Sequence, residues 1–347
     1  MKRNEIRPGY TVSKVIKGGW HLAGGHGSID ENKALEDMHE FVKAGITTFD
    51  CADIYTGVEE LIGKFRKKHH AEFRAGDLPS IQVHTKYVPD YGALATLKKE
   101  DTVKIIDRSL KRLQVERLDL VQFAWWDYQF PRYLETAVHL SELQKSGKIR
   151  YIGVTNFDTP RIEEMLDAGV EIAANQVQYS ILDRRVETNM TALAQKHNIP
   201  FLCYGTVAGG FLSDRYLGAP DPIQPLENRS LTKYRLIIDE FGGYDLFQKM
   251  LRTLRKVADK HEVGIAEIAS KYILQKSMVG GVIVGARNSK HLNGLQKLDS
   301  FSLDENDLNK ISEITNHSEG PNGPFYELER DKTGKHGAIM KYNLNEI

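Results

Sequence analysis

The chain has 347 residues, of which 41% are hydrophobic and 27% charged, proportions typical of a folded globular protein. Lys plus Arg and Asp plus Glu both number 47, so no net charge favours nucleic acid or an anionic membrane, and no apolar stretch is long enough to span a bilayer. Two cysteines without metal-ligand spacing and an N-terminus without an apolar leader predict a cytoplasmic protein with reduced thiols.

Short β-branched apolar runs alternate with longer amphipathic segments, which predicts a parallel sheet with helices as crossovers. The eight predicted strands are Ser13–Lys17, Thr47–Cys51, Ile81–Lys86, Leu118–Phe123, Ile149–Val154, Ile172–Gln176, Phe201–Tyr204 and Gly281–Val284. Predicted helices between them include Asn32–Ala44, Thr102–Leu113, Pro131–Ser146, Thr159–Ala168 and Val186–His197. Repeated units of this kind predict an α/β fold, a (β/α)8 TIM barrel that forms a single domain over residues 1–347.

Two segments depart from the repeating pattern. Residues 205–246 form a long stretch that is interrupted by Pro220, Pro222 and Pro225 before it becomes helical. Because long loops in compact barrels are usually functional covers, we expect this segment to cover a cofactor. The tail, residues 316–347, is polar and rich in turn residues, and we expect it near the active site.

Polar side chains at the strand exits can build a hydride-transfer site, because active sites in these barrels lie at the C-terminal ends of the strands. A carbonyl that accepts hydride needs a proton donor, and Tyr55 follows the second predicted strand. An ammonium beside the phenol lowers its pKa, and a carboxylate holds that ammonium in place. We therefore predict Tyr55, Lys86 and Asp50 as the catalytic residues and no metal site.

Three ordered segments carry a resemblance to a known family. Phe49–Tyr55, Gly153–Phe157 and Asn175–Ser180 resemble the signature segments of the aldo-keto reductase superfamily, and the resemblance covers roughly residues 10 to 315. It implies the interconversion of carbonyls and alcohols with NADP, or with NAD as the alternative cofactor, bound without a Rossmann fold. No Gly-x-Gly-x-x-Gly turn follows the first predicted strand.

The resemblance also implies positions for the cofactor. Thr155, Asn156 and Gln176 would bind the nicotinamide carboxamide, and Tyr204 would stack on its ring. The implied phosphate and adenosine contacts are Gly205, Gly209, Gly210, Phe211, Ser213, Gly285, Arg287 and His291. An Arg at a helix N-terminus suits an anion, so Arg287 favours NADP over NAD. Gly294-Leu295 replaces the family's Glu-Asn pair, which leaves the adenine contacts and the cofactor preference open.

The family's fourth catalytic residue, a His at the end of the fourth strand, is replaced by Ala124. Loss of one such preorganised donor typically costs about 10²- to 10³-fold in turnover. His84 and Gln122 share strand faces with Lys86 and Ala124, and His21 and His26 follow the first strand, so all four are alternative donors. For His84 alone, the favoured interpretation is a hydrogen-bonded residue of the barrel core.

Aromatic side chains surround the same strand exits. Trp20, Ala124, Trp125 and Trp126 are predicted to line the substrate site, with simple packing at the barrel rim as the alternative. His69-His70 is interpreted as a solvated helix end, because no partner ligands have suitable metal-site spacing.

Three functions fit these residues. The first is an NADP-dependent oxidoreductase that acts on a small aldehyde, ketone or sugar. The second is a cofactor-binding regulatory or redox-sensing protein with little turnover, which Ala124 favours. The third is redox-neutral chemistry with an internally recycled cofactor. The substrate and the oligomeric state are left open by the sequence.

Overall fold

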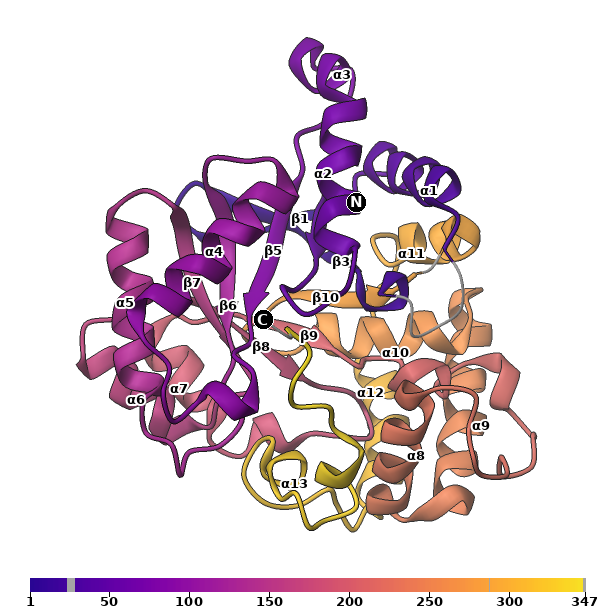
Figure 1. The fold of residues 1–347 in the computed structure, drawn as a ribbon. Helices are drawn as coiled ribbons and strands as arrows, with labels where there is room; N and C mark the ends of the chain where they lie inside the picture. The colour runs from indigo at the N-terminus through magenta and orange to yellow at the C-terminus, as the bar shows by residue number, and fades with distance from the viewer. Residues whose placement is uncertain (24–28, 287, 346–347) are drawn as a thin grey trace.

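The computed structural model describes residues 1–23, 29–286 and 288–345 and contains a closed barrel of eight parallel strands (Figure 1). The barrel strands are β3 (Val15–Gly18), β4 (Thr48–Asp50), β5 (Gln82–Tyr87), β6 (Leu118–Phe123), β7 (Ile149–Thr155), β8 (Ile172–Gln178), β9 (Phe201–Tyr204) and β10 (Val279–Gly285). They neighbour one another in chain order, and β10 closes the barrel against β3. Each predicted strand overlaps one of these, so the predicted (β/α)8 barrel is confirmed.

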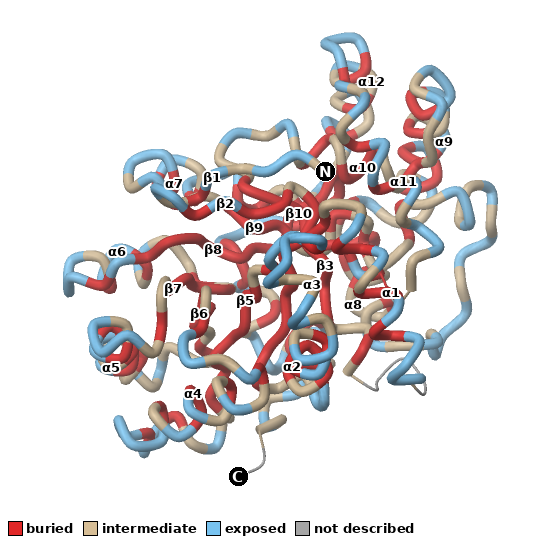
Figure 2. Tube along the Cα trace, turned by 90° about the horizontal axis from the view of Figure 1, so that it is seen from above, coloured by how far each residue is buried: buried red, intermediate tan, exposed pale blue. Residues whose placement is uncertain are grey.

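Helices cover the outside of the barrel, and their outward faces carry most of the exposed residues (Figure 2). Their bounds are α1 (Glu31–Lys43), α2 (Val58–Lys68), α3 (His70–Ala75), α4 (Lys99–Leu113), α5 (Tyr133–Lys145), α6 (Thr159–Asp167), α7 (Met190–His197), α8 (Arg229–Phe241), α9 (Gly243–His261), α10 (Ile265–Leu274), α11 (Leu292–Lys297), α12 (Glu305–Thr315) and α13 (Glu327–Arg330). Side-chain caps fix several starts: Asp30 accepts from the N–H of Lys33, and Asp158 from that of Arg161. None of the described helices is both long and apolar enough to cross a membrane.

An N-terminal hairpin, which the sequence does not predict, covers one end of the barrel. This end, formed by the N-terminal ends of the barrel strands, is called the closed end. Strands β1 (Arg3–Arg7) and β2 (Tyr10–Ser13) pair antiparallel around a turn in which Gly9 has φ +71°. Alternation puts Ile6, Tyr10 and Val12 on the face packed against the barrel interior, where they join Leu120 and Leu202. The other face is polar, so the short hairpin carries little apolar signal of its own.

The opposite end of the barrel, formed by the C-terminal ends of the strands, is called the open end. The strand register places polar residues of neighbouring strands side by side there. Asp50 pairs with His84 across β4 and β5, and Lys86 pairs with Gln122 across β5 and β6. Because side chains alternate along a strand, His84 and Lys86 face the same side at different depths.

The end of the chain crosses the open end, where Figure 1 shows it running from α13 towards β5. Tyr91 donates its backbone N–H to the carbonyl of Tyr342 at 2.9 Å. Farther along, Asn345 donates from its side chain to Asp53 at 3.2 Å and to the carbonyl of Val88 at 2.7 Å. The tail is thereby tied to the loops that follow β4 and β5.

Candidate active site

A buried lysine and aspartate form the centre of the open end. The Nζ atom of Lys86 lies 2.8 and 2.7 Å from the two carboxylate oxygens of Asp50 and 2.8 Å from the carbonyl oxygen of Cys51. These three acceptors match the three ammonium hydrogens, so the side chain has one well-defined position. The same Nζ atom lies 5.0 Å from the ring centroid of Tyr55. The structure therefore brings the three predicted catalytic residues together.

The charges of this group favour an ionised lysine beside a neutral phenol. Burial acts to lower the pKa of Lys86, but Asp50 and Tyr55 raise it by more, so the pKa lies above its usual value. Burial raises the pKa of Tyr55, and Lys86 offsets only part of that rise. The lowered pKa expected for Tyr55 is therefore wrong for this state, because desolvation of the phenolate outweighs the ammonium. The phenol holds its proton at neutral pH, as a proton donor must.

Two glutamine amides anchor the carboxylate from the far side of the barrel. Gln122 on β6 donates to Asp50 Oδ1 at 3.1 Å, and Gln176 on β8 donates to the same oxygen at 2.6 Å. Gln176 also donates to the side-chain oxygen of Gln122 at 2.9 Å. Gln122 therefore uses its side-chain amide to hold Asp50. This use argues against the role expected for Gln122 as a replacement donor at the position of Ala124.

The remaining candidate donors lie in different places. His84 is buried at the closed end, where its Nε2 atom lies 3.1 Å from the hydroxyl of Tyr10. Burial lowers the pKa of His84 to about 3, so the ring is neutral, and its predicted place in the barrel core is confirmed. His21 packs against Gly285, so closely that a Cβ there would lie 2.1 Å from the imidazole. His26 lies outside the described residues.

Trp20 lies beside the predicted proton donor. Its ring centroid is 5.0 Å from that of Tyr55, and its indole N–H donates to the hydroxyl of Ser230 on α8 at 3.2 Å. This position fits the predicted wall of a substrate site. Ala124 is half-buried, and its backbone N–H donates to the carbonyl of Tyr87.

The two tryptophans after β6 differ in their surroundings. Trp126 is half-buried, donates to the carbonyl of Pro89 at 2.9 Å and packs against Tyr342 of the tail. Trp125 is only 2% exposed, and its indole N–H donates to the carbonyl of Asp127 at 3.0 Å. The predicted role of Trp125 in lining the substrate site is therefore wrong, because its ring belongs to the core beside Phe123.

The residues expected to hold the nicotinamide lie together at the ends of β7, β8 and β9. Tyr204 donates its hydroxyl to the side-chain oxygen of Asn156 at 2.9 Å, and Thr155 donates to the backbone carbonyl of Gln176 at 3.2 Å. Gln176 uses its amide nitrogen on Asp50 and Gln122, and Asn156 uses its side-chain oxygen on Tyr204, so these bonds do not involve the Gln176 side-chain oxygen or the Asn156 amide nitrogen. One acceptor and one donor are what a carboxamide needs, so this set fits the nicotinamide group.

Glycines follow β9 where the cofactor phosphates are expected. Gly205 and Gly209 have φ of +74° and +65°, and a Cβ at these positions would lie 2.4 and 2.7 Å from the side chain of Tyr234 on α8. Glycine is therefore required there by helix packing as well as by any phosphate. Gly210 also has a positive φ, +104°, and its carbonyl accepts from the Ser213 hydroxyl at 2.6 Å.

The other expected cofactor contacts are only partly described. The side chain of Phe211 is buried in the core, so only its backbone is left to contact a ligand. Gly285 and His291 are exposed, the latter in a short turn that follows β10. Arg287, on which the expected preference for NADP rests, lies outside the described residues.

A buried ion-pair network that the sequence does not predict fixes the tail near this site. Arg185, in the loop after β8, lies 2.7 Å from Asp183 and 2.8 Å from Glu329 of α13, and all three are buried. Gln178 donates to Asp183 from the end of β8. In the sequence Asp183 and Arg185 look like part of an ordinary polar loop, because Glu329, the second partner of Arg185, lies 144 residues further along the chain.

Arg330, next to Glu329, fastens the tail to the strand exits. Its guanidinium donates to the backbone carbonyls of Trp126 at 3.0 Å and of Asn156, and lies 3.9 Å from the ring centroid of Tyr128. The tail therefore contacts both the expected substrate wall and the expected nicotinamide site.

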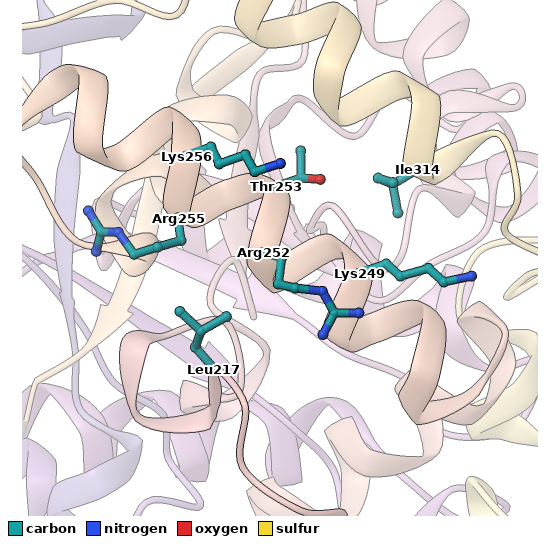
Figure 3. A pocket seen from close by; sticks show the side chains of 7 residues that line it. All are labelled: Leu217, Lys249, Arg252, Thr253, Arg255, Lys256 and Ile314. Carbon is teal, nitrogen blue, oxygen red and sulfur yellow. The ribbon is translucent and has the colours of Figure 1, made fainter.

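A hollow of about 450 Å³ lies outside the barrel along α9 (Figure 3). Its cationic side chains are Lys249, Arg252, Arg255 and Lys256, and Arg255 is paired with Asp214 and Asp259. Figure 3 shows that these side chains point in different directions, so they do not converge on one ligand.

The fold and this centre together define a class: a (β/α)8 barrel with a phenol, an ammonium and a carboxylate at the open end. The model of the Aldo/keto reductase family matches residues 14–316. The chain belongs to the Aldo/keto reductase family, and the predicted family is confirmed.

Similar proteins agree with this assignment. The chain is 27% identical to aldo-keto reductase YhdN of Bacillus subtilis over 326 residues, 88% of this chain and 92% of that one. It is 24% identical to L-glyceraldehyde 3-phosphate reductase of Escherichia coli O157:H7, covering 88% of this chain and 90% of the other. The solved structure of a glycerol dehydrogenase of Gluconobacter oxydans superposes with a TM-score of 0.74 at 24% identity, covering 93% and 98% of the two chains, and shows the same fold.

Proposed function

We propose that the protein is an NADP-dependent oxidoreductase that interconverts a carbonyl and an alcohol by hydride transfer, with Tyr55 as the proton donor. The observation that carries the proposal is the Lys86 ammonium, which is held by three acceptors and lies 5.0 Å from the ring centroid of Tyr55. Such an arrangement at the open end of a barrel suits proton transfer to a bound carbonyl.

In this proposal a bound nicotinamide supplies the hydride, and the residues of the chain manage the proton. In reduction, Tyr55 gives its hydroxyl proton to the carbonyl oxygen, and in oxidation it takes a proton from the alcohol. Lys86 stabilises the phenolate that remains after reduction. Asp50, anchored by the two glutamine amides, keeps Lys86 charged and aimed at the phenol.

The cofactor would be held by residues at the C-terminal ends of β7, β8, β9 and β10 and in the loops that follow them. Thr155, Asn156 and Gln176 would bind the carboxamide, and the ring of Tyr204 would stack on the nicotinamide. Residues 205–246, with their glycine-rich start and α8, would cover the phosphates. Arg287 favours NADP, and NAD is the alternative cofactor that the experiment below compares.

We propose a small aldehyde, ketone or sugar as substrate, and we place the enzyme in the cytoplasm, where Cys51 and Cys203 stay as free buried thiols. The similar proteins include a reductase of L-glyceraldehyde 3-phosphate and a dehydrogenase of glycerol, both of which act on small polyols or their aldehydes by name. Trp20 and Trp126 would form walls of the site. At Ala124, where the family resemblance implies a histidine, the side chain offers no hydrogen-bond donor to a substrate.

A second candidate function is cofactor binding with little turnover, as in a redox sensor. The observation in its favour is that the donors near Ala124 are used elsewhere: Gln122 on Asp50, and Trp126 on the carbonyl of Pro89. An enzyme without a substitute donor would be slow.

The two functions are separated by measuring binding and turnover on the same protein. Cofactor binding is measured by thermal shift and fluorescence with NADPH and NADH, and turnover by cofactor oxidation with a panel of aldehydes, ketones and sugars. The first proposal expects turnover that falls by about 10³-fold or more in Tyr55→Phe while cofactor affinity stays unchanged. Tight binding without turnover on the whole panel would support the second function.

A further inference from the structure

Three metal-ligating side chains meet on the helices outside the barrel: they are close in sequence to Asp50 and Tyr55 but lie on different elements. His39 lies on α1, His69 links α2 to α3, and Glu72 lies in the first turn of α3. His39 Nε2 is 3.0 Å from one carboxylate oxygen of Glu72, and His69 Nδ1 is 2.5 Å from the other. One ligand atom from each residue lies within 4.8 Å of the other two.

Packing holds the two imidazoles in this arrangement. Their rings are stacked with centroids 4.6 Å apart, and the ring of His69 packs on Phe65 of α2 at 4.9 Å. The side chains of His69, His39 and Glu72 are 12, 24 and 40% exposed, so the cluster is half-buried but open to ions. This order is more than three isolated surface side chains would show.

We propose that His39, His69 and Glu72 bind a divalent transition metal ion of the zinc type. Two imidazole nitrogens and one carboxylate are a preferred donor set for zinc, cobalt, nickel and copper, whereas magnesium and calcium select oxygen ligands. Three protein ligands leave the fourth tetrahedral position to water.

Binding needs only a small contraction of the cluster. Metal–ligand bonds of about 2.1 Å in a tetrahedral site place ligand atoms roughly 3.4 Å apart, so the present separations of up to 4.8 Å close by rotation of the imidazole and carboxylate groups. The metal replaces the protons that now join both rings to Glu72. Outside this shell, Glu40 lies 3.7 Å from His39 Nδ1, on the side of the ring where a carboxylate orients a metal-bound imidazole.

The location gives the ion a structural role. It would tie α1 to the α2–α3 junction, and Figure 1 shows α3 projecting from the molecule on the side opposite α13 and the tail. A metal there touches none of the proposed catalytic residues. The proposal is therefore independent of the proposed function, and it is tested without measuring activity.

The test uses the full-length protein after treatment with a chelator. Titration calorimetry with Zn²⁺ at pH 7.5 is expected to show one site of micromolar affinity or better, and Zn²⁺ is expected to raise the melting temperature. Co²⁺ is expected to give the visible absorption of a tetrahedral or five-coordinate site. His39→Gln and Glu72→Gln are each expected to weaken binding by about tenfold or more.

His70→Gln is the matched control, because His70 is exposed beside the cluster but does not belong to it. This variant is expected to bind Zn²⁺ as the parent does. The proposal is overturned if the parent binds no Zn²⁺ below about 100 μM, or if the double variant His39→Gln/Glu72→Gln binds as tightly as the parent, which would mean an adventitious ion only. Each variant's melting temperature without metal shows whether it is folded.

Discussion

The two ends of the barrel use the same strand for opposite purposes. On β5, His84 and Lys86 face the same side two residues apart. At the closed end, His84 contacts the hydroxyl of Tyr10 on the apolar face of the hairpin, and burial lowers the pKa of His84 to about 3. At the open end, Lys86 meets the carboxylate of Asp50, and its pKa is raised.

The difference shows that the partner met at each depth along the strand decides which ionisation state is stable. Both side chains are desolvated, and desolvation alone favours the neutral form of each. Only Lys86 has a carboxylate in contact, and that carboxylate is itself held by Gln122 and Gln176. The closed end therefore contributes stability, and the open end keeps a charge that catalysis can use.

The largest expected effect is on activity at the open end. Lys86→Met removes the ammonium beside Tyr55, and we expect kcat/KM to fall by about 10³-fold. The variant will also be less stable, since Asp50 is left buried without its partner. Steady-state kinetics per folded molecule, with the folded fraction taken from circular dichroism, separates the two effects.

His84→Leu is the matched change at the closed end of the same strand. We expect kcat/KM to stay within about threefold of the parent, because His84 contacts Tyr10 and not the site. A loss as large as that of Lys86→Met in a folded His84→Leu protein would show that depth does not divide the two roles.

The free energy of unfolding should fall most when the large buried side chain of the hairpin, Tyr10, is shortened. Tyr10 is 2% exposed, and Tyr10→Ala is expected to lower the free energy of unfolding by about 3–5 kcal/mol through the cavity that it leaves. Tyr10→Phe, which loses only the hydroxyl that bonds His84, should cost about 1 kcal/mol. Urea unfolding measures both, and equal losses would mean that the hydrogen bond and not the packing closes this end.

Restoring the absent histidine tests how complete the open end is. If the rest of the site is intact, Ala124→His should raise kcat by about 10²-fold. Ala124→Leu fills the same space without a donor and serves as the control. A similar gain in both variants would point to packing, and no gain in either would favour the cofactor-binding function.

A pH dependence of stability is also expected at the open end. Burial, together with Glu59, raises the pKa of Asp53 to about 7, above its usual 3.8. Between these values the folded state holds a proton that the unfolded state has lost, so stability falls as the pH rises through this window. Asp53→Asn should remove about 3 kcal/mol of that fall, measured by urea unfolding at pH 4.5 and pH 7.5. A parallel pH dependence in parent and variant would contradict the assignment.

The fold was largely predictable because its signal is local. Each barrel strand is a short apolar run, and alternation with amphipathic helices specifies the order of the elements. Asp50, Tyr55 and Lys86 were predictable for the same reason, since strand exits in such barrels converge. The hairpin was not predictable, because one face of β1 is polar and the role of its apolar face becomes clear only from its packing against the closed end of the barrel.

Other features of the site depend on partners that are distant in the sequence. The role of Gln122 follows from contacts with β4 and β8, and the burial of Trp125 follows from its neighbours in the folded core. In the sequence His69 resembles a solvated helix end, because its partner His39 lies thirty positions earlier on another helix. The direction in which the pKa of Tyr55 shifts depends on how deeply the phenol is buried, and the sequence does not give that burial.

The crossing of the tail over the open end has a practical consequence for handling the protein. Asn345 is anchored to Asp53 and Val88, so a tag or a fusion partner joined after it would emerge at the open end, the entrance proposed for substrate and cofactor. The amino group of Met1 instead bonds the carbonyl of Ala44 and lies 3.6 Å from Asp299, beside the turn that leads into β4. Immobilisation or labelling at the first residue would therefore leave the entrance clear.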